Sequence, residues 1–347
     1  MQHHIYVVGA GVMGTDIATA FLAAGHDVTL ADLSLEAAQL AQNRIQKRWA
    51  DKVMPAAFDV TLLDECRPAG NSMVIEAITE SLTAKRQLLT QIGAYSDPTV
   101  TLFSNTSTLS ISDLSDAVTH PERFAGLHFF FPAHRNPFLE VITAKQTSAA
   151  TVETAAGLAG KLGKHHIVCR DRPGFVVNAF YLPLVNEAVR LVDEKLGTPS
   201  EIDSVAKTIF GLRVGPLAVT RMMSPETTRL TISALVGQGA CPPLAASIAD
   251  DTAGRFEVEE SAVSVDQARE TQIRKRLLSA VFFPCLRMLE SGDVSESAID
   301  TAAVRALQFS HSPIALMRQM GAAAVERVLN EVSSDWGGSV PSSVAKL

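Results

Sequence analysis

A glycine-rich turn near the N-terminus is the sequence feature that most constrains how this chain can fold. Residues 5–8 form a short apolar run with β-branched side chains. They are followed by GAGVMG (residues 9–14) and by a helical pattern up to Ala24. A second strand-like run, residues 27–31, ends at Asp32. Strand, glycine turn, helix, strand and acid in this order form the context that a dinucleotide-binding fingerprint requires. The chain is therefore predicted to begin with a βαβ unit of a parallel sheet.

The glycines of this turn and the acid each have a physical role in binding a dinucleotide. Gly9 permits the tight turn, Gly11 lets the backbone approach the pyrophosphate, and Gly14 lets helix and strand pack closely. The helix N-terminus also attracts the phosphate charge. Asp32 can accept hydrogen bonds from both adenine-ribose hydroxyls and would repel a 2′-phosphate, which favours NAD over NADP. The residues of the turn expected to contact the cofactor are Gly9, Gly11, Val12, Met13 and Gly14.

The composition is that of a protein with a large apolar core. The 347 residues suggest two domains or slightly more, and 47% of them are apolar. The net charge of −7 argues against nucleic acid as a partner. No apolar run approaches the roughly 18 residues of a membrane span, so we expect no membrane partner. The first predicted strand begins almost at Met1, so we expect no signal or transit peptide.

The cysteines show no paired spacing of the kind that disulfides or zinc sites need, and no metal site is predicted. We expect them to be buried or incidental thiols in a reducing compartment, and the cytoplasm is the expected location. The four are Cys66, Cys169, Cys241 and Cys285.

A basic helix is predicted from Ser34 to about Met54. Its cations could bind the acidic end of a ligand, or they could form a solvated helix face. They are Arg44, Lys47, Arg48 and Lys52.

Beyond this helix the α/β pattern continues. Further strands are predicted at 74–78, 100–103, 126–131 and 139–143. The polar sequence SNTS (residues 104–107) follows the second of these, and open α/β sheets bind ligands at the carboxyl ends of strands. Alternatively these side chains cap the next helix, and Ser107 could do both. From Thr151 the periodicity is helical, and residues 171–174 (DRPG) are the expected hinge between a nucleotide-binding domain and a helical part.

The segment GLHFFFPAHRNPFLEVI (residues 126–142) sets a histidine and a glutamate in an apolar frame. An imidazole titrates near neutral pH and is a natural proton acceptor. A carboxylate beside it can fix its tautomer and stabilise the imidazolium that forms. The pair His128 and Glu140 is therefore a candidate base with its partner, although a histidine among phenylalanines can also be a hydrogen-bonded core residue.

Taken in order, the motifs resemble those of the L-3-hydroxyacyl-CoA dehydrogenase family from residue 5 to about residue 220. The matching set is GAGVMG, Asp32, VIEAITE (74–80), SNTS (104–107), GLHFFFP (126–132), FLEVI (138–142) and RPGFVVN (172–178). The resemblance implies NAD-dependent oxidation of the 3-hydroxyl of a 3-hydroxyacyl thioester, or the reverse reduction, as in fatty acid metabolism.

The resemblance also implies roles for individual residues. The family's catalytic group falls on Ser107, His128, Glu140 and Asn178. Its cofactor contacts fall on the glycine turn, Asp32, Glu80, Lys85 and Ser107. The substrate would be carried on coenzyme A.

Several positions depart from the family pattern. Phe131 stands where the family usually has an asparagine, and Ala179 where an arginine is common. Arg135 and Arg221 add cations in segments that, by resemblance, border the substrate cleft. Arginine binds carboxylates and phosphates in a bidentate fork, so the substrate could have an anionic acyl end or be carried on an acyl-carrier protein. A surface ion pair or a helix-end charge is the alternative for these arginines.

The helical half contains an internal repeat, because residues 178–232 align without gaps onto 275–329 at a constant offset of 97. The shared pairs are Arg190/Arg287, Ser200/Ser297, Ile202/Ile299, Asp203/Asp300, Ala206/Ala303, Pro216/Pro313, Ala218/Ala315, Arg221/Arg318 and Met223/Met320. The second copy has Lys275 in place of Asn178, so we expect it to be structural. The two copies could form a dimer-like pair within a monomer, while a homodimer through another face stays open.

The predicted fold is thus an α/β Rossmann-type NAD-binding domain followed by an all-α C-terminal part. The predicted domains are an NAD-binding domain (1–172), a first helical domain (173–235), a connector (236–270), a second helical copy (271–332) and a tail (333–347). The tail is expected to be poorly ordered.

Two other functions stay open at this point. One is an NAD-dependent dehydrogenase that acts on a free, polar or anionic hydroxy acid. The other is an NAD-binding protein without catalytic activity, which the departure at Phe131 keeps possible.

Overall fold

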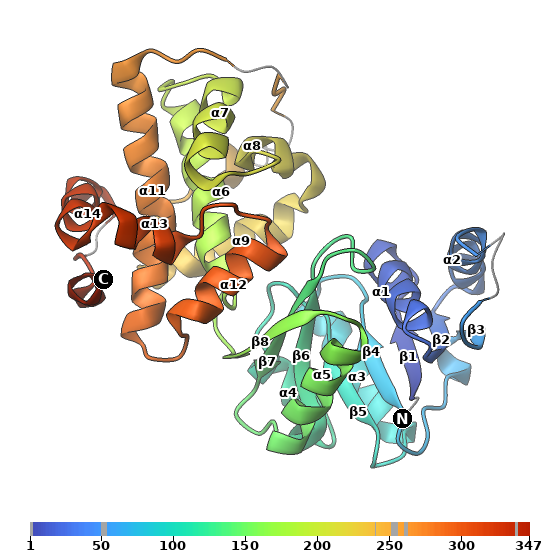
Figure 1. Ribbon diagram of the computed structural model, residues 1–347. Coiled ribbons are helices and arrows are strands. Elements are labelled where there is room, and N and C mark those ends of the chain that lie inside the picture. Colours follow the sequence, from blue (N-terminus) through green and yellow to red (C-terminus); the bar gives the residue numbers. More distant parts are fainter. Residues whose placement is uncertain (1–2, 50–53, 240, 251–255, 260–262, 337–338) are drawn as a thin grey trace. The chain divides into compact units, whose positions relative to one another are not determined.

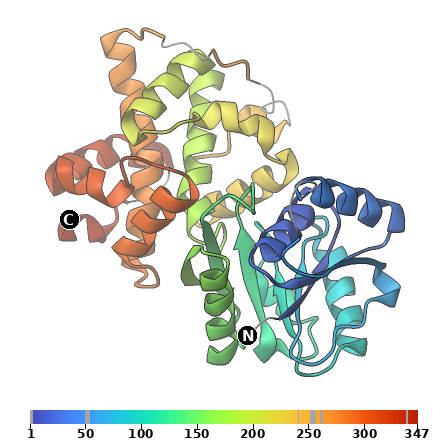
Figure 2. The same ribbon diagram turned by 45° about the vertical axis from the view of Figure 1, so that its right-hand side comes forward.

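The chain divides into two compact units, Met1–Arg172 and Pro173–Leu347 (Figure 1). The structure is a computed structural model that describes residues 3–49, 54–239, 241–250, 256–259, 263–336 and 339–347. The first unit contains a sheet with helices on its faces, and in the second unit the described elements are helical (Figure 2).

The first unit is built on one eight-stranded sheet of order β3-β2-β1-β4-β5-β6-β7-β8. Its strands are β1 (His4–Val8), β2 (Asp27–Asp32), β3 (Phe58–Leu62), β4 (Met73–Glu76), β5 (Thr101–Ser104), β6 (Phe124–Phe129), β7 (Phe138–Thr143) and β8 (His165–Arg170). All neighbours pair in parallel except β6 and β7, which are antiparallel. The chain order reverses beside β1, between β1 and β4. Open sheets bind their ligands at such a point.

The helices of this unit begin where the sequence supplies a capping side chain. They are α1 (Val12–Ala23), α2 (Leu35–Lys47), α3 (Leu82–Tyr95), α4 (Ile111–Ser115) and α5 (Ala149–Lys161). Ser34, Ser81, Ser110 and Ser148 each accept a hydrogen bond from a backbone N–H in the first turn of α2, α3, α4 and α5. Helix α1 differs, because its N-cap residue is Gly11, which has no side chain to accept a hydrogen bond from the first turn.

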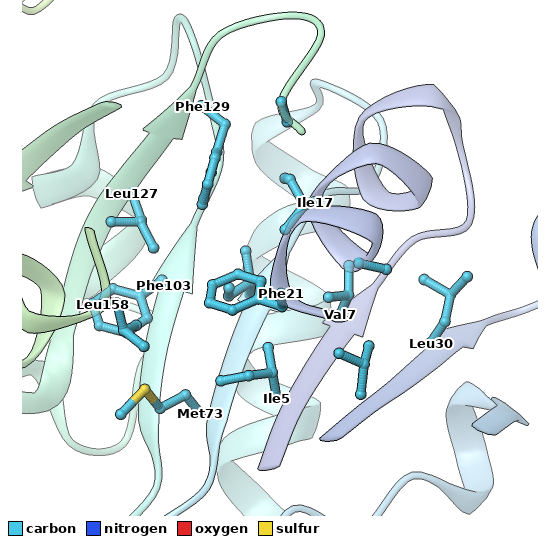
Figure 3. Close-up of a cluster of buried hydrophobic side chains, with 14 of the residues drawn as sticks. Ile5, Val7, Ile17, Phe21, Leu30, Met73, Phe103, Leu127, Phe129 and Leu158 are labelled. Carbon is cyan, nitrogen blue, oxygen red and sulfur yellow. The ribbon is translucent and has the colours of Figure 1, made fainter. Parts of the chain in front are cut away.

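One face of the sheet packs against α1, α2 and α5 through a continuous apolar cluster. In Figure 3, Phe21 and Ile17 of α1 lie over strand side chains that include Val7 and Phe129. Because side chains alternate along a strand, the residues of β6 and β7 that lie between these core positions point to the other face. His128 and Glu140 are such residues.

The two edge strands were not predicted from the sequence. Both β3 and β8 lie at the ends of the sheet order, where one side of the strand pairs with no other strand of the described residues. Their side chains are mostly half-buried or exposed, and polar residues interrupt the apolar pattern that marks a central strand. The predicted six strands correspond to β1, β2 and β4–β7, with ends that differ by at most two residues.

The second unit consists of two helix groups joined by a short helix. The first group is α6 (Val177–Asp193), α7 (Pro199–Phe210), α8 (Pro216–Val219) and α9 (Pro225–Gly237). The joining helix is α10 (Ala246–Ala249), and the second group is α11 (Gln267–Glu290), α12 (Glu296–Ala306), α13 (Pro313–Met320) and α14 (Ala322–Trp336). The connector predicted at 236–270 thus includes α10 and the first turn of α11.

The two helix groups correspond at the offset of 97 that the sequence repeat has. Helices α7, α8 and α9 begin 97 residues before α12, α13 and α14. The carboxylate of Asp203 accepts a hydrogen bond from the N–H of Leu217 at 2.8 Å, and that of Asp300 accepts one from Ile314 at 2.9 Å. Gly211 and Gln308, also 97 apart, both have positive φ after the helix, 63° and 60°. The two helix groups therefore share helix starts, an aspartate contact and a positive-φ residue at equivalent positions.

Helices α6 and α11 pack along each other and form the centre of this unit (Figure 1). Glu187 of α6 is fully buried and is paired with Arg190 at 2.8 Å and with Arg276 of α11. Arg276 also binds Glu194, at 3.0 Å through its second terminal nitrogen. Because breaking a buried ion pair leaves a charge uncompensated, removing Arg276 or Glu187 alone should destabilise the packing of α6 against α11.

The prediction of a poorly ordered tail is wrong for residues 339–347. Ser342–Lys346 form a short 3-10 helix that packs against α11 and α14. Ser343 donates a hydrogen bond to the carbonyl of Leu286 at 2.8 Å, and its side chain and that of Val344 are buried. Among the described residues, no helix combines the length and apolar character that crossing a bilayer requires.

Candidate functional site

The glycine turn lies at the carboxyl end of β1 and opens into a cavity of about 460 Å³. Gly9 has a φ of 108°, and a Cβ on Gly14 would lie 1.7 Å from the carbonyl oxygen of Gly9. These two positions therefore require glycine for the turn itself. A Cβ on Gly11 would meet no atom within 4 Å, so there is open space in which a ligand can approach the backbone of this residue. The arrangement fits a pyrophosphate at the N-terminus of α1.

Asp32 ends β2 and lines the same cavity. Its Oδ2 accepts a hydrogen bond from the N–H of Ala10 at 2.7 Å, and its Oδ1 accepts one from Ser34 at 3.0 Å. Each carboxylate oxygen keeps further acceptor capacity, so the side chain can both hold the turn and bind ribose hydroxyls. Of the other predicted contacts, Val12 is exposed at the start of α1 and Met13 is half-buried.

The remaining walls of this cavity were not predicted. Leu33 and Leu63 contribute apolar surface, and Gln87 and Gln91 of α3 add amide groups. Apolar side chains with a few amides are suited to a purine ring. The sequence has no signal for this wall, because α3 and the segment after β3 meet only in the folded unit.

His128 and Glu140 lie directly opposite each other in the antiparallel β6–β7 pair. The Nδ1 atom of His128 is 2.7 Å from Oε2 of Glu140. The carboxylate is fully buried and the histidine is 5% exposed. An ionised carboxylate can only accept, so the tautomer of a neutral imidazole that suits this contact has its proton on Nδ1 and its basic nitrogen at Nε2. This is the arrangement predicted for a base and its partner.

Ser107 follows β5 in a loop that Glu80 holds. Oε1 of Glu80 accepts hydrogen bonds from the hydroxyl of Thr106 at 2.6 Å and from the N–H groups of Ser107 and Thr108 at 2.9 and 3.0 Å. The hydroxyl of Ser107 is 3.5 Å from the same oxygen. Burial raises the pKa of Glu80, but Lys85 and these hydrogen bonds outweigh it, and the pKa lies below its ordinary value of 4.5.

Lys85 is almost completely buried, at 1% exposure, and its ammonium lies between two carboxylates. It is 2.5 Å from Oε1 of Glu76 and 3.2 Å from Oε2 of Glu80. The cofactor contacts predicted for Lys85 and Glu80 stay predictions. Glu76, which the sequence did not single out, is the second partner of this lysine.

Phe131 and Arg135 lie together at a second cavity of about 770 Å³. Phe131 is 55% exposed there. Arg44 of α2 and Arg48, the residue that caps the end of this helix, also line the cavity, so three guanidinium groups contribute to its lining. This places the basic helix predicted from Ser34 beside the segment that follows β6, while Lys52 lies outside the described residues. A pocket with this excess of cations is suited to an anionic ligand.

A second carboxylate–histidine pair lies in this pocket. Oδ1 of Asp16 is 2.9 Å from Nδ1 of His134 and 3.5 Å from a guanidinium nitrogen of Arg48, and its Oδ2 accepts from the N–H of Ala133 at 3.0 Å. The ammonium of Lys164 donates a hydrogen bond to the carbonyl of Ala133 in this loop at 2.7 Å. Burial lowers the pKa of Lys164 to about 8, while Asp16 acts in the opposite direction. The partners Asp16 and His134 are too far apart in sequence for any local pattern to pair them.

The other two predicted site residues belong to the second unit. Asn178 is the second residue of α6 and is half-buried. Arg221 is exposed in the 3-10 turn Thr220–Met222. Its repeat partner Arg318 pairs with Glu296, but Pro199 occupies the corresponding position of the first copy, so that ion pair has no counterpart at Arg221. The catalytic role of Asn178 and the substrate role of Arg221 stay predictions.

No group of three or more metal-ligating side chains occurs in the part of the chain that the structure describes.

Two family models match the chain. The 3-hydroxyacyl-CoA dehydrogenase NAD binding domain matches residues 4–172, and the 3-hydroxyacyl-CoA dehydrogenase C-terminal domain matches residues 174–251. Together they cover the glycine turn, the His128–Glu140 pair and Asn178.

Curated relatives agree with these models. Hydroxyacyl-coenzyme A dehydrogenase, mitochondrial, of Mus musculus is 33% identical over 246 residues, which are 66% of this chain and 78% of that protein. The 3-hydroxyadipyl-CoA dehydrogenase of Escherichia coli K12 is 33% identical over 233 residues, 64% of this chain and 49% of that protein.

Solved structures share the fold. The 3-hydroxybutyryl-CoA dehydrogenase of Escherichia coli K12 has a TM-score of 0.83 at 21% identity and covers 100% of this chain and 98% of its own. The (S)-3-hydroxybutyryl-CoA dehydrogenase of Ralstonia eutropha has a TM-score of 0.65 at 30% identity, over 72% of this chain and 93% of its own. The predicted fold, a Rossmann-type domain followed by helices, is confirmed.

Proposed function

The chain belongs to the 3-hydroxyacyl-CoA dehydrogenase family, and from that premise we propose that His128 is its general base and Glu140 the partner of that base. The protein is an NAD-dependent oxidoreductase of this family, which confirms the predicted cofactor and reaction class. The observation that carries the assignment of roles is the 2.7 Å contact between the two side chains at the carboxyl end of β6.

The chemistry follows from the protonation state of this pair. Oxidising a secondary alcohol removes a hydride from carbon and a proton from the hydroxyl. NAD, when bound at the glycine turn, would supply the acceptor for this hydride. The Nε2 lone pair of His128 takes the hydroxyl proton as the carbonyl forms, and the Glu140 carboxylate stabilises the imidazolium that results. In the reverse direction, the imidazolium returns this proton to the oxygen.

Two neutral side chains are proposed to orient the substrate. Ser107 donates its hydroxyl to the substrate oxygen, and Asn178 donates its amide to the thioester carbonyl. Neutral donors suit this role because an added charge would change the basicity of the histidine. Support for Ser107 comes from the three hydrogen bonds with which Glu80 fixes its loop.

Replacing His128 by glutamine tests this proposal. We expect turnover of a 3-hydroxyacyl-CoA to fall by about 10²- to 10⁴-fold, the usual contribution of a general base, while NAD binding is unchanged. Turnover is followed by the absorbance of reduced nicotinamide, and NAD binding by calorimetric titration. A variant that keeps near-normal turnover would remove His128 from the mechanism.

We further propose that the cavity at Phe131 and Arg135 binds the phosphate groups of the thioester carrier. Arg44, Arg48 and Arg135 supply the charge, and guanidinium groups bind phosphate in a bidentate fork. The Arg48→Ala variant should raise KM for a coenzyme A thioester and leave KM unchanged for the corresponding N-acetylcysteamine thioester, which lacks phosphate. Equal effects on both substrates would exclude phosphate binding here.

As an alternative to carrier phosphates, the arginines of this cavity could bind an anionic acyl end of the substrate. A carboxylated 3-hydroxyacyl-CoA should then respond to Arg135→Ala more strongly than an unsubstituted one. An equal response would assign Arg135 to the carrier or to structure alone.

For the second unit, we propose that the two helix groups are a duplicated domain whose copies pair within one chain. The matching helix starts and the paired Asp203 and Asp300 contacts support this. The α6–α11 packing would then replace a contact between subunits, and the protein would be monomeric. Light scattering should give the mass of one chain, and a stable mass of two chains would contradict the proposal.

A further inference from the structure

We infer that Glu76 is a positioning residue, which sets the place of Ser107 through Ser104, Lys85 and Glu80. This inference rests on the role proposed above for Ser107. Glu76 is the last residue of β4 and is fully buried. In this inference Glu76 does not contact the substrate and acts only through these three residues.

The carboxylate of Glu76 organises the loops that follow two neighbouring strands. Its Oε2 accepts a hydrogen bond from the hydroxyl of Ser104, the last residue of β5, at 2.5 Å. That hydroxyl accepts in turn from the N–H of Thr106 at 3.2 Å. Its Oε1 accepts from the N–H of Ile78 at 2.8 Å, in the loop that lines the dinucleotide cavity. The loop after β4 and the loop after β5 are thus fixed by one side chain.

A second path runs through the buried lysine. Lys85 binds Oε1 of Glu76, and its ammonium also binds Glu80, which holds Ser107 and its neighbours. Without Lys85, the fully buried carboxylate of Glu76 and the 16% exposed one of Glu80 would face the same space, which like-charge repulsion and desolvation both oppose. Both paths end on the loop that carries Ser107.

Glutamine cannot replace Glu76 in this network. Three donors reach the carboxylate: the ammonium of Lys85, the N–H of Ile78 and the hydroxyl of Ser104. An amide has one acceptor oxygen, and its NH₂ group must face one of these donors. If it faces Ser104, the direction of that hydrogen bond is reversed: the hydroxyl accepts from residue 76, can no longer donate to it, and has to turn its proton elsewhere. The loop is then free to move by a fraction of an ångström.

A double-mutant cycle tests the inference on the full-length protein. The four proteins are wild type, Glu76→Gln, Ser107→Ala and the double variant, compared by kcat with a 3-hydroxyacyl-CoA and saturating NAD. We expect Glu76→Gln to lower kcat about 10- to 100-fold, because small misplacements of an orienting group have effects of this size. We expect the double variant to be within about 2-fold of Ser107→Ala, because residues that act as one unit are not additive.

The matched control is Glu187→Gln, the same change at a fully buried glutamate that also has cationic partners, Arg190 and Arg276. It should lower the melting temperature and leave kcat unchanged. Should Glu76→Gln fail to fold, Ser104→Ala breaks the first path with a smaller change and enters the same cycle.

The possible outcomes distinguish the positioning role of Glu76 from the proposed role of Ser107 in orienting the substrate. Effects of Glu76→Gln and Ser107→Ala that multiply would overturn the positioning role and leave Ser107 in place. A Glu76→Gln variant with wild-type kcat would do the same. A fully active Ser107→Ala variant would overturn both statements.

Discussion

Replacing Glu140 by glutamine isolates the charge of the central pair. Glutamine keeps an oxygen that can accept from Nδ1 of His128, so the 2.7 Å hydrogen bond can persist while the negative charge is lost. The site is buried, and solvent screening of the pair is therefore weak. The charge matters most in the transition state, where the histidine becomes an imidazolium.

The magnitude follows from the strength of such contacts. A hydrogen bond to a charged group contributes about 1.5–3 kcal/mol. If that stabilisation is lost only in the transition state, kcat falls by about 10- to 150-fold, because about 1.4 kcal/mol corresponds to a tenfold change in rate. The dissociation constant of NAD should not change, because neither side chain lines the dinucleotide cavity.

The assay measures kcat by reduced-nicotinamide absorbance and NAD affinity by calorimetry. Glu122→Gln is the matched control, since Glu122 forms the same type of pair with His120, at 3.4 Å and well exposed to solvent. Exposed pairs contribute little, and this variant should behave as wild type. If Glu140→Gln keeps more than about half of the wild-type kcat, the electrostatic argument for the pair is refuted.

Three further predictions concern the cofactor site and its supports. Gly14→Ala should lower the melting temperature and abolish NAD binding, because its Cβ would lie 1.7 Å from the Gly9 carbonyl oxygen. The control Gly11→Ala should fold normally, because a Cβ there meets no atom within 4 Å. Equal melting temperatures of the two variants would contradict the packing argument. Asp32→Ser should weaken NAD binding by about 10- to 150-fold and reduce the preference over NADP, and titration with both cofactors checks this. Because the pKa of Glu80 is lowered in the folded state, its contribution to stability is complete above its ordinary value of 4.5 and is lost as pH falls through the lower value. Urea unfolding of wild type should therefore show a steeper loss of stability below that pH than Glu80→Gln, and parallel curves would show that Glu80 does not contribute.

The sequence was most informative where a local rule fixes the structure. The glycine turn, its strand and its helix follow from backbone sterics, and β1, α1 and β2 are where the pattern puts them. The position of His128 relative to Glu140 could be anticipated in part, because the loop between β6 and β7 is too short for a parallel crossover, so an antiparallel pair is required.

Contacts between distant segments could not be predicted. The cofactor contact of Lys85 stays a prediction, and no local pattern indicated that its ammonium would lie between the carboxylates of Glu76 and Glu80. The pairing of Asp16 with His134 depends on α1 lying beside the loop after β6, and nothing in either segment indicates the other. The edge strands were missed for a different reason, since half-exposed strands lack a continuous apolar signal.

The way β6 and β7 pair has a consequence for how such a protein can diversify. His128 faces Glu140 because four residue pairs, from Gly126 with Ile142 to Phe129 with Leu139, set the register of the two strands. The eight residues that connect the strands, 130–137, take no part in that register. Phe130 packs its ring 4.4 Å from that of His128 and is tied to the pair, but positions such as Phe131 and Arg135 can change without shifting the register that sets His128 opposite Glu140. The positions proposed to contact the substrate and the proposed base are thus neighbours in the chain, yet they can vary independently.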